Sequence, residues 1–192
     1  MPALLKRAGE LGLLMIDVPQ AYGGLELHKT TSMLVSERGA LCASFSVSWG
    51  AHTGIGTLPL VYYGTEAQKQ ANLPKLASGE WLAAFALTEA AAGSDVASNR
   101  MRAVRDGDDY VLNGSKRFIT NAGVADIYVC FAKTDPDAGH RGISAFLVEA
   151  GAPGLEIGRI EAKLGVRGST TGELILDDCR IPAANLLGDE GE

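Results

Sequence analysis

The periodicity of the sequence changes near residue 84, and this change constrains the possible folds more than any other feature. Before it, apolar residues recur at helical spacing, as in the segment 3–11, and Gly-rich corners separate such segments. After it, short runs of β-prone residues alternate with turn dipeptides. The sequence therefore predicts an α+β multidomain chain, in which an N-terminal α-helical domain precedes an antiparallel β-barrel or sandwich domain.

Local signals divide the chain further. The clearest helix start is Thr65, because Gln68 follows three positions later, as in a capping box. Pro74 is expected to end or bend that helix, since proline lacks the N–H group that a helix interior uses. We expect three parts along the chain: a helical domain over 1–83, a β domain over 84–185, and the start of a linker over 186–192.

The second half carries repeated strand and turn signals. Asp106-Gly107 and Asn113-Gly114 are dipeptides typical of tight hairpin turns, and β-prone residues flank both. Neither a βαβ alternation nor a G-x-G-x-x-G motif occurs, which argues against a Rossmann dinucleotide domain. Further strands are predicted over four segments: 125–134, 142–150, 154–160 and 171–182.

Charge and composition exclude several classes of partner. With 17 basic and 23 acidic residues the formal net charge is −6, and no dense Lys/Arg cluster offers a surface for nucleic acid. No apolar run approaches the roughly 20 residues that span a membrane, and the N-terminus makes a poor secretory signal. The cysteines and histidines lack the spacing of metal ligands, and three dispersed cysteines favour free thiols in a reducing compartment.

One segment leaves an apolar region through polar side chains and then carries almost no bulky ones. The apolar run that ends at Leu87 is followed by Thr88-Glu89, by four small residues, and then by Ser94-Asp95. Small residues allow backbone groups to approach a neighbour or a ligand closely. Gly-Ser-Asp is also common turn chemistry, so these residues alone are equally compatible with an ordinary loop.

Two motifs make the chain resemble the acyl-CoA dehydrogenase family. Residues 88–95, TEAAAGSD, are similar to its T-E-P-x-A-G-S-D motif, and residues 113–121, NGSKRFITN, match its N-G-x-K-x-(W/F)-I-T-N motif. VPQAYGG and GTEAQKQANLPKLASGE resemble the helical domain of the family, and residues 163–192 resemble the end of its β domain. Among its branches, SVSWGAHTGIG and ADIYVCFAKT look most like the long-chain and very-long-chain enzymes.

The resemblance implies FAD as the cofactor and an acyl-CoA thioester as the substrate. Thr88 would contact the pyrimidine edge of the flavin, and Thr120 would donate a hydrogen bond toward its N5 atom. Ser94 would lie beside the pantetheine arm of the substrate and so take part in substrate binding. The resemblance assigns cofactor contacts to nine residues: Phe85, Ala86, Leu87, Thr88, Gly93, Ser94, Phe118, Ile119 and Thr120.

Each of these assignments has a structural alternative. Thr88 could cap a helix, Thr120 could be a strand residue that faces solvent, and Phe118 could be a core aromatic as well as a flavin contact. Glu89 and Asp95 are expected to accept hydrogen bonds from nearby N–H groups rather than to transfer protons.

Two departures from the family pattern bear on function. Ala90 stands where the motif has proline, so a looser loop is expected there. The C-terminal helical bundle of the family, which carries its catalytic glutamate, would begin after Glu192, so no catalytic residue is expected in this chain. The chain is also expected to start inside the first helices of the family, and so to be a fragment that is inactive by itself. Lys133, His140 and Arg141 flank a loop that could approach CoA phosphates, but a solvated loop is the expected structure.

As part of a longer protein, the chain is expected to serve the α,β-dehydrogenation of acyl-CoA thioesters to trans-2-enoyl-CoA in fatty-acid β-oxidation. The resemblance implies electron-transferring flavoprotein as the electron acceptor, a homodimer or homotetramer, and a bacterial cytoplasm or mitochondrial matrix as the location. Two alternatives stay open. One is an acyl-CoA oxidase or flavin monooxygenase-like relative, and the other is a catalytically inactive module that binds flavin or CoA.

Overall fold

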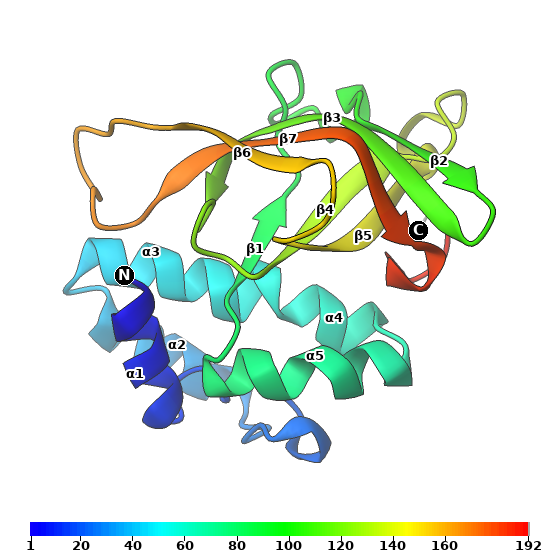
Figure 1. Ribbon diagram of the computed structural model, residues 1–192. Coiled ribbons are helices and arrows are strands. Elements are labelled where there is room, and N and C mark those ends of the chain that lie inside the picture. Colours follow the sequence, from blue (N-terminus) through cyan, green and yellow to red (C-terminus); the bar gives the residue numbers. More distant parts are fainter. Residues whose placement is uncertain (192) are drawn as a thin grey trace.

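The computed structural model describes residues 1–191 and has two layers, with the helices packed below one eight-stranded sheet (Figure 1). The described α-helices end by Ser78 and the strands begin at Ala83, which confirms the predicted fold class. The helices before the sheet are α1 (Pro2–Glu10), η1 (Gln20–Tyr22), α2 (Lys29–Gly39), α3 (Ala43–Gly50), the π-helical η2 (Ala51–Gly56), α4 (Leu58–Tyr63) and α5 (Glu66–Ser78).

The sheet has the strand order β6-β7-β3-β2-β4-β5-β8, and β1 pairs with β4 beside this path. Most neighbours are antiparallel, whereas β1 runs parallel to β4, and β2 meets β4 in parallel where Arg102 lies opposite Lys133. The strands are β1 (Ala83–Ala86), β2 (Arg102–Asp106), β3 (Asp109–Thr120), β4 (Ile127–Lys133), β5 (Ile143–Glu149), β6 (Leu155–Ile160), β7 (Thr171–Pro182) and β8 (Leu186–Leu187). Short 3₁₀ turns lie between them: η3 (Val96–Ser98), η4 (Gly139–Gly142) and η5 (Ala183–Asn185).

The segment expected to begin a linker, 186–192, starts inside the sheet. Leu186 and Leu187 form β8 and pair with β5, and Leu187 is buried among residues that also contact the helices. Gln68 of α5 donates hydrogen bonds to the carbonyl oxygens of Ala184 and Leu186, both at 2.7 Å. These contacts join the end of the β domain to the helical layer.

Helix α5 begins as the sequence indicates but continues past its proline. The Gln68 side chain accepts from the backbone N–H of Thr65 at 2.9 Å, and the Thr65 hydroxyl accepts from the backbone N–H of Gln68 at 3.3 Å, which confirms the capping box. Pro74 lies within the helix, which continues to Ser78, so of the two expected outcomes, an end or a bend, the end is wrong. Burial of the neighbouring Leu73 against the sheet offsets the lost backbone hydrogen bond.

Only one of the two predicted hairpin dipeptides forms a hairpin. Asp106-Gly107 leads into the two-residue turn between β2 and β3, as predicted. Asn113-Gly114 lies inside β3, so the second hairpin prediction is wrong; the register with β7 shifts there as at a β-bulge. Gly114 has φ 147°, and a Cβ atom at this position would lie 3.0 Å from Met101. Close approach of two backbones therefore requires the glycine here, not a turn.

The central strands have two buried faces, which explains why their sequences are continuously apolar. On β4, Tyr128 and Cys130 contribute to the cluster inside the sheet domain. Ile127 and Val129 point the other way, into a second cluster that includes residues of α4 and α5. The helical layer and the sheet therefore share a core across β4, as Figure 1 shows for the helices that cover this strand.

The cysteines are free thiols, as predicted: Cys42 is exposed, and Cys130 and Cys179 are buried. Burial raises the pKa of the Cys130 thiol to about 12 and that of Cys179 to about 11, so both stay protonated at neutral pH. Within residues 1–191 there is no group of three or more His, Cys, Asp or Glu side chains that could hold a metal ion. No helix in this range is long and apolar enough to cross a membrane.

His52 is buried where η2, α5 and β1 meet. Its Nδ1 atom accepts a hydrogen bond from the backbone N–H of Ala83 at 2.9 Å, so Nε2 carries the proton and donates to the Leu76 carbonyl at 3.0 Å. Burial lowers the pKa of the imidazole to about 4. This histidine has a structural role, because it joins the last turn of α5 to the first strand.

We expect the free energy of unfolding to fall as the pH is lowered from about 6.5 to about 4. The unfolded chain protonates His52 below its ordinary pKa of 6.5, whereas the folded chain resists protonation down to about 4. The loss amounts to about 3 kcal/mol over this window. Urea titrations of the wild type and of His52→Gln, which can keep both hydrogen bonds, measure it. Equal pH slopes for the two proteins would contradict the assignment.

Candidate functional site

The two sequence motifs lie side by side through hydrogen bonds between β3 and the segment after β1, which join residues 29 positions apart. The backbone N–H of Arg117 donates to the Thr88 carbonyl at 2.8 Å, and the Lys116 ammonium donates to the Leu87 carbonyl at 3.1 Å. The Thr88 carbonyl belongs to the first motif, the Leu87 carbonyl directly precedes it, and both donors belong to the second motif. The structure thus places residues 87–88 beside residues 116–117, which directly precede the predicted site residues 118–120.

A fully buried lysine is the centre of this arrangement. Besides the Leu87 carbonyl, the Lys116 ammonium contacts a carboxylate oxygen of Glu89 and the side-chain oxygen of Asn99, each at 2.8 Å. Three acceptors therefore match its three N–H donors. Glu89 also accepts from the backbone N–H groups of Arg100 at 2.7 Å and Met101 at 2.9 Å. As expected, Glu89 is a structural acceptor.

Lys116 and Asn99 were not among the residues predicted for the site. A signal for Lys116 exists in the sequence, because strand alternation from Tyr110 and Leu112 places position 116 on the inward face. A lysine at an inward position requires a buried carboxylate, and Glu89 in the other motif supplies it. No comparable periodicity marks Asn99, since it lies in irregular backbone.

Phe118 lies on the surface in an unusual backbone conformation. It occupies a register shift between Lys116 and Ile119, has φ 59°, and is 61% exposed. The alternative that Phe118 is a core aromatic is therefore wrong. An aromatic residue in the left-handed region costs about 1–3 kcal/mol and occurs mostly at functional sites. The bulge turns this ring outward from the sheet.

The other predicted residues differ in whether their side chain or only their backbone could contact a ligand. Ile119 is 2% exposed and belongs to the core, so only its backbone can face a ligand. The ring of Phe85 packs against Phe131, with centroids 4.9 Å apart. Thr120 is half-buried at the end of β3, opposite Thr171.

The loop after β1 is held by local hydrogen bonds. Glu89 and Ala92 exchange backbone hydrogen bonds of 3.0 and 3.2 Å, which closes the stretch of small residues into a tight turn. The half-buried Thr88 begins no helix, because the next helical turn starts at Val96, so the capping alternative does not hold. Asp95 accepts from the Ser98 hydroxyl, which is the structural role expected of it. Gly93 and Ser94 remain exposed beyond this turn.

Asn121 fixes the end of β3 against the helical layer. It is fully buried with φ 67°, a conformation that asparagine tolerates better than most residues. Its side-chain amide donates to the Ser48 carbonyl of α3 at 3.0 Å, and its backbone N–H donates to the Thr170 carbonyl at 3.1 Å. Its position next to Thr120 limits the movement of that residue.

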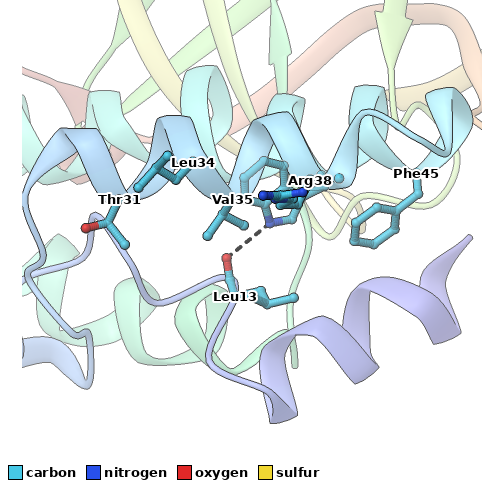
Figure 2. A pocket seen from close by; sticks show the side chains of 8 residues that line it. Leu13, Thr31, Leu34, Val35, Arg38 and Phe45 are labelled. Atoms are coloured by element: carbon cyan, nitrogen blue, oxygen red, sulfur yellow. Dashed lines mark hydrogen bonds between the residues drawn. The ribbon is translucent and has the colours of Figure 1, made fainter.

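A further pocket is separate from these motifs. It is an apolar groove of about 580 Å³ in the helical layer, between α2, α3 and the segment after α1. Figure 2 shows Leu34, Val35 and Phe45 around it, with the Trp49 indole donating to the Leu13 carbonyl at 3.1 Å. None of the predicted site residues lines this groove.

We expect Lys116→Met to lower the free energy of unfolding by about 3–5 kcal/mol, because it leaves the buried Glu89 carboxylate without its counter-charge. Arg117→Met is the matched control: its ion pair with Glu173 is half exposed, so its loss costs about 0–1 kcal/mol. Adding Glu89→Gln to Lys116→Met should recover part of the loss. Urea unfolding measures all variants, and equal costs for the two single methionine variants would refute the buried pair.

Comparison with known proteins agrees with the two-domain arrangement. Family models described as Acyl-CoA dehydrogenase, N-terminal domain and Acyl-CoA dehydrogenase, middle domain match residues 1–80 and 84–179. A probable acyl-CoA dehydrogenase of Bacillus subtilis (strain 168) is 51% identical over 191 residues, which cover 98% of this chain and 32% of that protein. The mitochondrial isovaleryl-CoA dehydrogenase of Pongo abelii is 46% identical over 97% of this chain and 45% of its own length.

A solved structure gives the same result. The acyl-CoA dehydrogenase from Bacillus anthracis, crystallised as a complex with FAD, has a TM-score of 0.93 and 46% identity, covering 99% of this chain and 32% of that one. This chain therefore spans about a third to a half of the length of these relatives. Because two domain models match in order across both folded layers, the chain belongs to the acyl-CoA dehydrogenase family.

Proposed function

We propose that this chain forms the N-terminal and middle domains of an FAD-dependent acyl-CoA dehydrogenase, which oxidises acyl-CoA thioesters to trans-2-enoyl-CoA in fatty-acid β-oxidation. The observation that carries the proposal is the outward-facing Phe118, held in left-handed backbone beside Thr120 and the Thr88 loop. If the Phe118 ring contacted only solvent, no interaction would compensate for the energy of its left-handed backbone. A flat aromatic ligand on this surface would explain it.

The residues present fit a flavin. Phe118 offers an exposed aromatic ring, and the half-buried Thr88 and Thr120 offer hydroxyl groups for its polar edge. Two hydrogen bonds from β3 hold the Leu87–Thr88 backbone, so the groups that would contact the ring are rigid relative to one another. Preorganised contacts of this kind reduce the entropy lost on binding.

When bound, FAD supplies an acceptor for the hydride that leaves the β-carbon of the substrate. The residues of this chain bind and orient: Thr88 and Thr120 would hold the flavin, and Ser94 would lie beside the pantetheine arm of the thioester. Glu89 already accepts three hydrogen bonds inside the protein, so we assign it no proton transfer. No proton acceptor is assigned among the site residues.

The finer points of the function are also proposals. The relative from Pongo abelii is named for isovaleryl-CoA, which carries a short, branched acyl group. It therefore does not support the long-chain branch, which local sequence similarity favours. We propose electron-transferring flavoprotein as the electron acceptor, a homodimer or homotetramer as the assembly, and a bacterial cytoplasm or mitochondrial matrix as the location.

The test is anaerobic reduction of the flavin. The whole protein that contains this chain is purified with FAD and mixed with short, branched and long acyl-CoA thioesters, and bleaching of the flavin absorbance is followed. Bleaching by at least one thioester, with slow recovery in air, is the expected result. Fast recovery in air would favour an acyl-CoA oxidase or a monooxygenase-like relative. No bleaching by any thioester would favour an inactive binding module and refute the proposal.

We expect Thr120→Ala to slow flavin reduction roughly 3- to 10-fold, because a lost hydrogen bond is worth about 0.5–1.5 kcal/mol. Its melting temperature should change little. The matched control is Thr171→Ala, which removes the same groups from the residue directly opposite on β7. Stopped-flow reduction and thermal unfolding of both variants measure the two effects. An unchanged reduction rate, or equal slowing in both variants, would refute the role of Thr120.

A further inference from the structure

The sequence contains a single Asn-Gly pair, Asn113-Gly114, which the structure places inside β3 and not in a hairpin. Asparagine before glycine is chemically reactive, because the glycine has no Cβ atom to hinder the approach of its backbone nitrogen to the asparagine side chain. Asn113 is exposed, so water and hydroxide can reach it. The pair is therefore a candidate site of deamidation, and its reactivity depends on how the strand holds the side chain.

The neighbouring strand β7 holds the Asn113 side chain at both ends of its amide group. The Nδ2 atom donates to a carboxylate oxygen of Asp178 at 3.0 Å, and the Oδ1 atom accepts from the backbone N–H of Asp178 at 2.8 Å. Two hydrogen bonds to one residue fix both the position and the rotation of the amide. Its carbon cannot turn toward the nitrogen of Gly114 until both hydrogen bonds break.

The bulge between the two strands creates this contact. The register of β3 with β7 shifts between Leu112 and Gly114, so Asn113 faces two consecutive residues of β7, Asp177 and Asp178. Asp178 has φ 46°, a left-handed conformation that aspartate tolerates better than most residues. In this conformation it presents both its backbone N–H and its carboxylate to the same amide.

We propose that Asn113 is a deamidation site that the pairing of β3 with β7 keeps unreactive, and that the product of deamidation weakens this pairing. When the strands part locally, hydroxide removes the proton of the Gly114 backbone nitrogen, which then attacks the Cγ atom of Asn113. The new C–N bond forms, the bond from Cγ to Nδ2 breaks, and the amide nitrogen takes a proton from water and leaves as ammonia. Water then opens the succinimide at either carbonyl, which leaves aspartate or isoaspartate at position 113.

The product cannot restore the original contact. A carboxylate at position 113 has no N–H group to donate, and it places a negative charge against the Asp178 carboxylate that accepted the lost hydrogen bond. Like charges opposite each other on neighbouring strands are destabilising. Isoaspartate also adds a carbon atom to the backbone of β3, two residues before the buried Lys116. Deamidation is therefore a one-way change that lowers the stability of the strand pair.

The test incubates the whole protein with FAD in mildly alkaline buffer and follows the mass increase of the peptide that contains residue 113. We expect deamidation of the folded protein to be roughly 10- to 100-fold slower than in urea, because opening must break two hydrogen bonds, one of them charge-assisted. Asp178→Gly suits the left-handed backbone but removes the acceptor, so it should accelerate deamidation roughly 10-fold. Asp137→Gly, which removes an exposed carboxylate between β4 and η4, is the matched control and should leave the rate unchanged.

A second pair of variants tests the product without any reaction. Asn113→Asp reproduces the aspartate product and should lower the melting temperature, whereas Asn113→Asp/Asp178→Asn should recover most of the loss, because the new amide donates to the new carboxylate. This pair decides the matter if circular dichroism shows that Asp178→Gly does not fold. Equal deamidation rates in the folded protein and in urea, or in Asp178→Gly and Asp137→Gly, would overturn the proposal. An Asn113→Asp protein that melts at the wild-type temperature would also overturn it.

Discussion

The buried contact between Lys116 and Glu89 is the interaction on which the candidate site depends. Burying two opposite charges is costly unless every donor and acceptor finds a partner. Here the ammonium has three acceptors and the carboxylate has three donors, two of them backbone N–H groups after η3. The contact therefore fixes a side chain from β3, a turn after β1 and the start of β2 in one arrangement.

Two surfaces acquire their shape from this contact. On one side, the loop carbonyls at Leu87 and Thr88 are hydrogen-bonded to β3, directly before the bulge that turns Phe118 outward. On the other side, Asn99 connects the same network to a surface pocket near the start of β2, which Arg102 and Lys133 also line.

The helical layer contributes by covering the sheet face that β4 and β1 present. Because β4 buries side chains on both faces, its position is determined by two clusters at once. His52 and Asn121 add polar connections from η2 and β3 across the same boundary. The strand end that carries Thr120 is thus attached to the helices as well as to the sheet, which restricts its motion.

Local sequence by itself determined the order of helices and strands, the capping box at Thr65 and the turn at Asp106-Gly107, because these depend on side chains and backbone groups a few residues apart. It also indicated the motif segments and the structural role of Glu89. It did not reveal that Asn113-Gly114 is a bulge, that α5 continues through Pro74, or that Phe118 is exposed. Those outcomes depend on partners distant in sequence: β7 beside β3, the sheet beneath α5, and the register shift after Lys116. Likewise, Arg102 and Lys133 become one basic pocket only when β2 and β4 pair, because charge repulsion depends on distance in space and not on separation along the chain.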